Sequence, residues 1–163
     1  MKNFSIFLGI FLALAASRFI PHPPNYTNLI ALSFYVPAFL GIKFIPLVVI
    51  SFFITDLYFG FHSSLLFTWG SVVLIGCIPL LFKGSISSRL LGATCGAISF
   101  YIVTNFGVWV SGSYGYTVEG LVNCFILAIP FFWPILVSTI AYSLIIELAY
   151  KIYIRGFKKV SIS

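Results

Sequence analysis

Asp56 and Arg18 are the charged side chains whose positions most directly suggest a binding site. Asp56 lies near the end of the apolar segment 44–59, and Arg18 lies near the end of the apolar segment 4–20. A carboxylate at membrane depth costs about 2–3 kcal/mol on insertion scales, so it normally has a partner or lines a wet cavity. We expect an Arg18–Asp56 pair that either joins the two segments or contacts a ligand.

Two histidines lie in the polar segments that follow. His62 precedes Ser63 in a pattern typical of a tight turn with a serine at the start of the next helix. Its imidazole either binds a ligand or metal or is simply solvated. His22 and Asn25 lie in the loop 21–26, where prolines fix the backbone. This loop is either a preformed lid over a site or a rigid turn.

Asn105 and Trp109 are four residues apart and share one helix face. An amide in the bilayer must find a hydrogen-bond partner. The indole either stacks on a planar ligand or belongs to the aromatic belt of the membrane interface. Glu119 follows the Gly-Tyr loop 112–116 and is a candidate at the outer rim of the site. The expected substrate-binding residues are Arg18, His22, Asn25, Asp56, His62, Asn105, Trp109 and Glu119.

No catalytic motif accompanies these residues. The sequence has no HExxH, GxSxG or DxxD pattern, and Asp56 with His62 would leave most of a metal's coordination shell unfilled. We therefore expect no enzyme activity, no metal site and no resident cofactor; an intramembrane enzyme would need a second carboxylate facing Asp56. Cys77, Cys95 and Cys124 lie in apolar segments, so we expect small buried side chains and no disulfides.

Long apolar segments must position the candidate residues. The 163-residue chain is 61% hydrophobic and only 7% charged, whereas soluble domains are about 25% charged. Six spans of about 20 residues would use about 120 residues and leave no room for a soluble domain. We expect an all-α polytopic integral membrane protein, a single domain over 1–163, with no role in nucleic-acid binding despite its net charge of +6. The expected spans are about 4–20, 27–42, 44–59, 63–82, 89–111 and 134–154.

The segment 117–129 also has a helical pattern. Joined to the last span it would form about 38 residues, roughly 57 Å, which is too long for one crossing. Pro130 and Pro134 supply a break, so we predict a short interfacial or re-entrant helix before the sixth span. In an alternative interpretation, Lys2 and the following apolar segment form a cleavable secretory signal, which would leave five spans.

The distribution of basic residues predicts the orientation, because Lys and Arg are retained on the cytoplasmic side. With both termini inside, eight of the nine basic residues are cytoplasmic, and only Arg18 is outside. The eight are Lys2, Lys43, Lys83, Arg89, Lys151, Arg155, Lys158 and Lys159. We predict a protein of the bacterial inner (cytoplasmic) membrane with both termini in the cytoplasm and a site that opens outward.

Three segments carry a family resemblance: 16–25 with ASRF and HPPN, 55–62 with TDLYFGFH, and 104–109 with TNFGVW. They resemble a functionally uncharacterised bacterial family of six-helix membrane proteins that is similar to the S components of energy-coupling factor (ECF) transporters. S components are substrate-binding membrane subunits for vitamins and metal ions. The resemblance covers most of the chain and implies an S-component-like bundle.

A looser resemblance links the chain to the solitary cobalamin S components, in which a cysteine after the third helix ligates cobalt. His62 stands near that place, which implies an axial ligand if the substrate is a corrinoid. The chain lacks the amino-terminal histidine pattern of the nickel and cobalt S components. In S components the first helix contacts the coupling subunit through small residues, a role that Gly9, Ala13 and Ser17 could fill. Alternatively, this face packs within the protein.

These observations predict an S-component-like, substrate-binding membrane subunit for uptake of a small molecule, such as a vitamin or a cofactor precursor like a corrinoid. The expected partners are the substrate, the lipid bilayer, and an ECF-type coupling subunit with its ATPases. The alternative is a structural or accessory subunit of a larger membrane complex. In that case the 19 phenylalanines would contact lipid, pigment or neighbouring helices.

Overall fold

Helices form almost the whole chain in the computed structural model, which describes residues 2–160 and the side chains of residues 4–153. No β-strand occurs within residues 2–160, and the predicted all-α class is confirmed. The helices, with two short 3₁₀ turns, are α1 (Lys2–Phe19), α2 (Leu29–Leu40), η1 (Ile42–Phe44), α3 (Ile45–Phe59), α4 (Leu65–Cys77), η2 (Ile78–Leu80), α5 (Ile86–Val110) and α6 (Val118–Val160).

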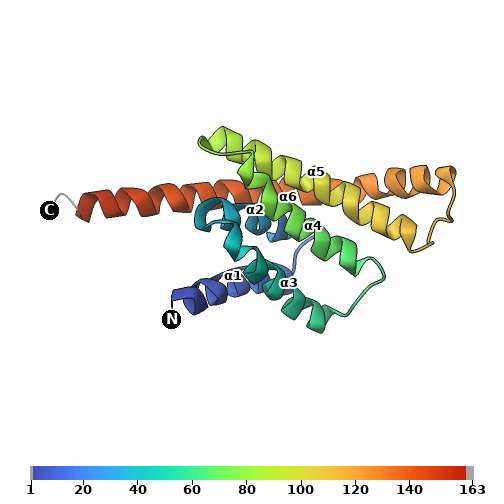
Figure 1. Ribbon diagram of the computed structural model, residues 1–163, viewed down its shortest axis with the longest axis horizontal. Helices are drawn as coiled ribbons and strands as arrows, with labels where there is room; N and C mark the ends of the chain where they lie inside the picture. Colours follow the sequence, from blue (N-terminus) through green and yellow to red (C-terminus); the bar gives the residue numbers. More distant parts are fainter. Residues whose placement is uncertain (1, 161–163) are drawn as a thin grey trace.

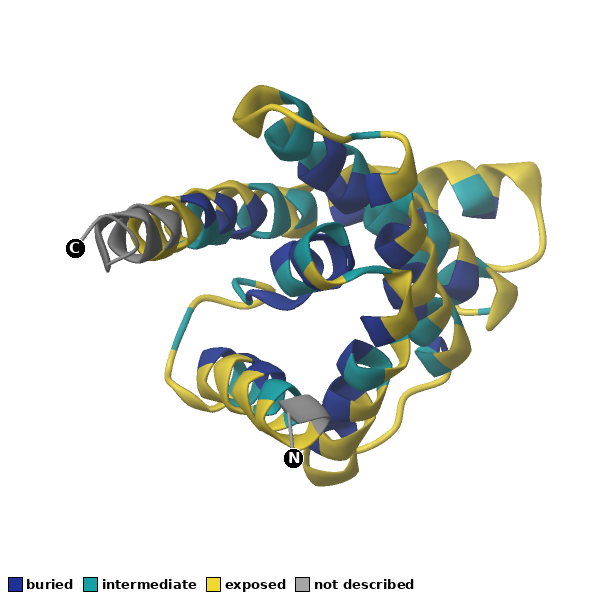
Figure 2. Ribbon diagram, turned by 60° about the vertical axis from the view of Figure 1, so that its left-hand side comes forward, coloured by how far each residue is buried: buried dark blue, intermediate teal, exposed yellow. Residues whose placement is uncertain are grey.

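Helix α2 lies at the centre of the bundle and is buried along most of its length (Figure 2). One of its sides shares an apolar cluster with α1, α3 and α4, which includes Leu14 and Val48. The other side contributes Phe34 to a second cluster, which includes Ala93 of α5 and packs against α6. Helix α2 therefore lies between α1 and α3 on one side and α5 and α6 on the other, while α4 contacts α2, α3 and α5.

Three helical segments are long and apolar enough to cross a membrane: Ile42–Phe59, Ile86–Val110 and Val118–Tyr153. Helices α1, α2 and α4 are apolar but shorter. Helix α2 has 12 residues, or about 18 Å, against a hydrocarbon core of about 30 Å. Residues 2–160 form six α-helices, one fewer than the six spans and the separate interfacial helix that were expected. Length and composition support a crossing for three of the described helices, so six spans stay a prediction.

The fourth helix is shorter than expected, because α4 ends at Cys77 and passes into the 3₁₀ turn η2. Pro79 lies inside η2 and cannot donate the backbone hydrogen bond that would continue an α-helix. The second helix also ends early, at Leu40, where Gly41 has a φ of 99°. Glycine adopts such a φ without steric cost.

Helix α6 runs without interruption over 43 residues. The predicted division at Pro130 and Pro134 into an interfacial helix 117–129 and a span 134–154 is therefore wrong. Each proline removes one backbone donor, a loss that packed helices in membranes tolerate. At about 1.5 Å per residue the helix is about 64 Å long.

Packing against α5 explains why α6 stays straight enough to continue past its prolines. The ring of Tyr101 lies 5.7 Å from that of Phe125 and 4.9 Å from that of Phe132, measured between centroids. The Tyr101 hydroxyl also donates to the carbonyl oxygen of Phe125. These contacts lie on both sides of Pro130. Tertiary packing therefore keeps α6 continuous where the local sequence predicts a break.

Both described chain ends lie at the left of Figure 1, while the loops 60–64 and 111–117 lie at the right. This arrangement agrees with an even number of passes along the bundle. The side of the membrane on which each end lies stays a prediction. The side chains of Lys2, Arg155, Lys158 and Lys159 lie outside the described set.

The three cysteines are free thiols. Cys124 is buried and Cys95 is half-buried, whereas Cys77 is exposed at the end of α4. The expectation that all three are buried is therefore wrong for Cys77. Cys77 lies in an apolar segment, but on a helix face that points away from the bundle.

Gly120, in the first turn of α6, fits closely against the preceding loop. A Cβ there would lie 2.2 Å from the carbonyl oxygen of Tyr114 and 2.7 Å from that of Gly115. Because these are backbone atoms, Gly120→Ala should lower the free energy of unfolding by about 1–3 kcal/mol. Thermal unfolding in detergent measures this effect. Gly70→Ala is the matched control, since a Cβ at Gly70 meets nothing within 4 Å, and equal melting temperatures would contradict the prediction.

Candidate functional site

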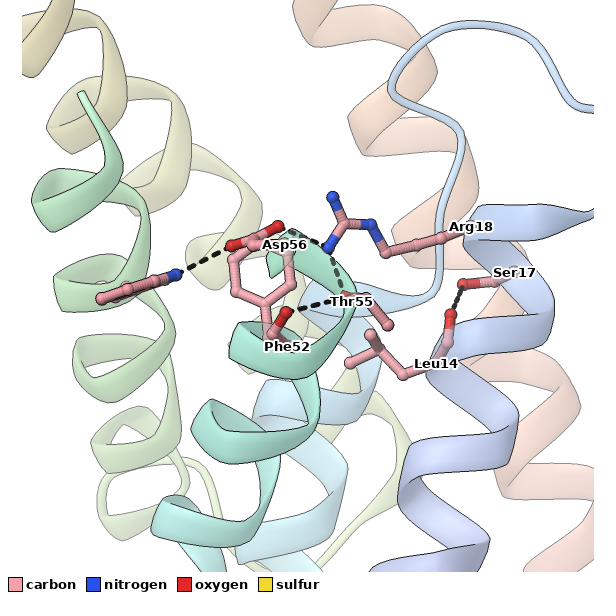
Figure 3. Close-up of polar contacts among 7 residues, drawn as sticks. Leu14, Ser17, Arg18, Phe52, Thr55 and Asp56 are labelled. Atoms are coloured by element: carbon pink, nitrogen blue, oxygen red, sulfur yellow. Dashed lines mark hydrogen bonds and ion pairs between the residues drawn. The ribbon is translucent and has the colours of Figure 1, made fainter. Parts of the chain in front are cut away.

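The predicted pair of Arg18 and Asp56 is present, with 2.6 Å between Nη1 and Oδ1 (Figure 3). Arg18 comes from the last turn of α1 and Asp56 from the last turn of α3. Only 4% of the Asp56 side chain and 17% of the Arg18 side chain are exposed. The pair joins the ends of two helices that pack side by side.

Asp56 is also bound from α4. Its Oδ2 accepts a hydrogen bond of 2.9 Å from Nε1 of Trp69. Both carboxylate oxygens therefore have charged or polar donors, as a buried carboxylate requires. Sequence reasoning missed Trp69, because an indole in an apolar helix usually contributes only to packing or to the interfacial belt.

The guanidinium of Arg18 is held between aromatic rings and polar groups. Its Cζ lies 4.7 Å from the ring centre of Phe52 and 4.8 Å from that of Phe59. Nη1 donates to both Asp56 and the hydroxyl of Thr55. Nε and Nη2 have no hydrogen-bond partner among the described residues, and Nη2 points away from Asp56 in Figure 3. One edge of a rigidly placed cation is thus free to bind a further group.

A cavity of about 490 Å³ is lined in part by Arg18. Five of the eight predicted site residues line it: Arg18, His22, Asn25, His62 and Asn105. Asp56 does not line the cavity itself but holds Arg18 there. The remaining polar lining comes from Thr27, Thr68, Thr104 and Ser138, and the aromatic lining from Phe52, Phe59, Phe100 and Phe131.

The two loops position their histidines by short-range contacts. Nδ1 of His22 lies 2.6 Å from the carbonyl oxygen of Pro23, so this nitrogen carries the proton. Asn25 follows with a φ of 63°, a left-handed conformation that asparagine tolerates better than most residues. Nδ1 of His62 lies 3.1 Å from Oγ of Ser64, the residue that precedes α4. Nε2 of each histidine is free of these contacts.

Trp109 and Glu119 lie away from the cavity. The ring of Trp109 contacts those of Phe106 and Tyr116, and its buried Nε1 has no partner among the described residues. Glu119 is exposed in the first turn of α6. Neither residue lines the cavity. Both lie at the end of the α5–α6 hairpin, which extends past the ends of α3 and α4 in Figure 1.

The small-residue face of α1 is partly exposed. A Cβ added to Gly9 meets no atom within 4 Å, and Ala13 is exposed. Ser17 is buried, and its hydroxyl lies 2.7 Å from Oδ1 of Asn28. The amide nitrogen of Asn28 donates to the Ala13 carbonyl oxygen at 2.8 Å. Ser17 thus contributes to packing within the chain, and docking of a partner on this face stays a prediction.

A second buried ion pair, absent from the sequence-based site, joins α5 to α6. Arg89 donates to Glu147 through two nitrogens, with Nε to Oε1 at 2.6 Å and Nη2 to Oε2 at 2.7 Å. Only 14% of the Arg89 side chain and 5% of the Glu147 side chain are exposed. Arg89 is predicted only as a cytoplasmic basic residue at the start of the span 89–111; in the structure it folds back on the bundle and also donates to the Gly84 carbonyl oxygen.

Among residues 4–153, whose side chains are described, no three His, Cys, Asp or Glu residues lie close enough together to hold a metal ion. His62 has one free ring nitrogen at the cavity. Its predicted role as an axial ligand depends on a substrate that supplies its own metal.

Neither a search of curated proteins nor one of solved structures gives a match to this chain. Residues 1–160 match the model of a family described as Family of unknown function (DUF6580). The match covers the cavity, both ion pairs and every helix, and the chain belongs to the DUF6580 family.

Proposed function

We propose that this protein is a membrane-embedded binding subunit that takes up a small molecule through the cavity beside Arg18. One observation carries the proposal: a cavity of about 490 Å³ brings together nine polar residues from segments far apart in the sequence, five of them among the predicted site residues. Ligand sites in proteins have this character, a mostly apolar concavity with a few converging polar groups.

The volume of the cavity bears on the substrate. Ligand pockets for drug-sized molecules measure about 300–1,000 Å³, and 490 Å³ lies within this range. A complete corrinoid is much larger than a drug-sized molecule and would extend beyond the cavity. Of the expected vitamins and cofactor precursors, the smaller ones fit this site better, and His62 would then act as a hydrogen-bonding group.

The resemblance to ECF S components supports uptake as the purpose of binding. In this proposal the protein lies in the bacterial inner membrane with both termini in the cytoplasm, and the cavity faces outward. Helix α1 would offer Gly9 and Ala13 to a coupling subunit that carries ATPases. Transport would follow from closure of the loops and tilting of the bundle.

The alternative function, a subunit of a larger membrane complex, draws support from a different feature. The carboxyl-terminal part of α6 projects past the other helices at the left of Figure 1. Its described residues include the exposed apolar side chains of Leu148, Ile152 and Tyr153. A neighbouring subunit would bury this segment as well as lipid would.

Ligand extraction tests the binding function. The protein is purified in mild detergent, and the extract is analysed by mass spectrometry for a stoichiometric small molecule. Ala128→Phe, which fills the cavity wall, should lose at least about nine-tenths of that molecule, because overpacking a site costs about 1–3 kcal/mol. Ala149→Phe, at an exposed position of the same helix, should retain it.

Two results would contradict the proposal. One is equal retention of the molecule by both variants while both remain folded by thermal unfolding. The other is a preparation without any bound small molecule that migrates on native gels as a large stoichiometric assembly. The second result would support the structural alternative.

A further inference from the structure

The hydrogen-bonding character of the cavity differs between its two sides. On the side of α1 and α3, Arg18 presents Nε and Nη2, which can only donate. The guanidinium is fixed in place, since Asp56 and Thr55 hold Nη1 and its Cζ lies within 5 Å of the ring centres of Phe52 and Phe59. This side therefore requires an acceptor on the ligand.

The side formed by α5 and α6 has the opposite character. Oγ1 of Thr104 donates its hydrogen to the Phe100 carbonyl oxygen at 2.7 Å, and Oγ of Ser138 donates to that of Ile135 at 3.0 Å. With the hydroxyl protons used within each helix, only lone pairs remain for the cavity. We call Thr104, Asn105 and Ser138 the acceptor wall.

Asn105 completes the acceptor wall. Its Nδ2 donates to the carbonyl oxygen of Tyr101 at 2.7 Å. Because that carbonyl can only accept, the amide orientation is determined, and Oδ1 is left without a partner among the described residues. Helix α1 makes no extensive contact with α5 or α6. The cavity therefore lies between Arg18 and this wall.

Most of the remaining lining is apolar, apart from Thr27, Thr68 and the loop residues His22, Asn25 and His62. Phe100 and Phe131 contribute aromatic rings, and Leu29, Ile30 and Ile135 contribute aliphatic side chains. Aromatic side chains favour stacked or edge-to-face contact with a flat ring. His22 and His62 lie on the loop side. Nδ1 of His22 donates to Pro23, which leaves Nε2 of the neutral ring as an acceptor, whereas His62 can donate or accept and does not select between ligand types.

We propose that the ligand is a planar ring compound with a carboxylate or carbonyl group toward Arg18 and an N–H donor toward the acceptor wall. This inference rests on the proposed binding function and adds the substrate class. A carboxylate would bind the free edge of Arg18 through two parallel hydrogen bonds. An amino group at the other end would meet lone pairs that the protein itself leaves unused.

Two sets of small probes test the class. One set is 4-aminobenzoate, benzoate and aniline; the other is 6-amino-2-naphthoate, 2-naphthoate and 2-naphthylamine, which allows for a longer cavity. Binding to the purified protein is measured by calorimetry after removal of any bound ligand. In at least one set, the compound with both groups should bind about tenfold or more tightly than either partner, because an unpaired buried polar group is costly.

Thr104→Val removes one acceptor while keeping the side-chain shape. It should reduce the preference for the amino compound over its parent acid by about fivefold or more. Thr94→Val is the matched control: Thr94 lies on the same helix, makes the same kind of bond to the Leu90 carbonyl oxygen, and does not line the cavity. It should leave the preference unchanged.

The outcomes separate the substrate class from the binding function. If a molecule co-purifies and Ala128→Phe expels it, but the probes bind equally or not at all up to about 10 mM, the class is wrong and binding stands. An unchanged preference in Thr104→Val would also overturn the class. If no molecule co-purifies and no probe binds, both proposals fail.

Discussion

Asp56→Ala should lower the free energy of unfolding by about 3–5 kcal/mol, the range expected when one partner of a buried ion pair is removed. Arg18 would keep its place between Phe52 and Phe59 with its charge no longer balanced. Trp69 would lose the acceptor for its Nε1. Since Asp56 joins α1, α3 and α4, loss of its carboxylate should also loosen the contacts between these helices that hold Arg18 at the cavity. Thermal and denaturant unfolding in detergent measure the effect.

The double variant Arg18→Met with Asp56→Leu distinguishes an unpaired charge from lost packing. Replacing both members of a buried pair by apolar residues is often close to neutral, so the double variant should be more stable than Asp56→Ala. Glu119→Ala serves as the control for removing a carboxylate, because Glu119 is exposed. A double variant as unstable as the single one would refute this explanation of the pair.

Glu147→Leu should be destabilising by a similar amount, about 3–5 kcal/mol, at the other end of the bundle. It would remove the two carboxylate oxygens that accept from Arg89. The guanidinium of Arg89 lies 5.2 Å from the ring centre of Phe39. The contact of Arg89 with the Gly84 carbonyl oxygen should weaken as well, and the loop before α5 should become easier to cleave. Limited proteolysis alongside thermal unfolding tests both effects.

The companion variant is Arg89→Met with Glu147→Leu. It should recover stability relative to Glu147→Leu, since no unpaired charge remains. Neither residue lines the cavity beside Arg18, so both variants should keep the bound small molecule as long as they stay folded. Loss of that molecule from a folded Arg89→Met/Glu147→Leu protein would show that this pair and the cavity are coupled.

The Arg18–Asp56 pair was predictable because a charge in an apolar segment needs a partner, and each residue offered the other a suitable one. The same rule applies to Glu147, which lies in the last apolar segment. The Arg89–Glu147 pair was missed because Arg89 was counted only among the cytoplasmic basic residues, at the start of the span 89–111. Pairing across 58 positions in the chain depends on how α5 and α6 pack.

Thr104 and Ser138 could not be identified from the sequence. A hydroxyl in an apolar helix commonly bonds to its own backbone, so its presence carries no signal of a cavity. Only the packing of α5 and α6 shows which of many such hydroxyls face a common space. The continuity of α6 past Pro130 and Pro134 is a further tertiary effect, because α5 supports the helix where local propensity predicts an end.

The unbroken course of α6 makes it a lever. Its 43 residues form a rod of about 64 Å, and pivoting such a rod by about 5° at one end shifts the other by about 5–6 Å. Phe131 touches the cavity partway along this rod, and Glu147 lies further toward the carboxyl end. A rotation of this helix that starts at the cavity would therefore produce a larger displacement at its far end, because the helix is continuous between the two.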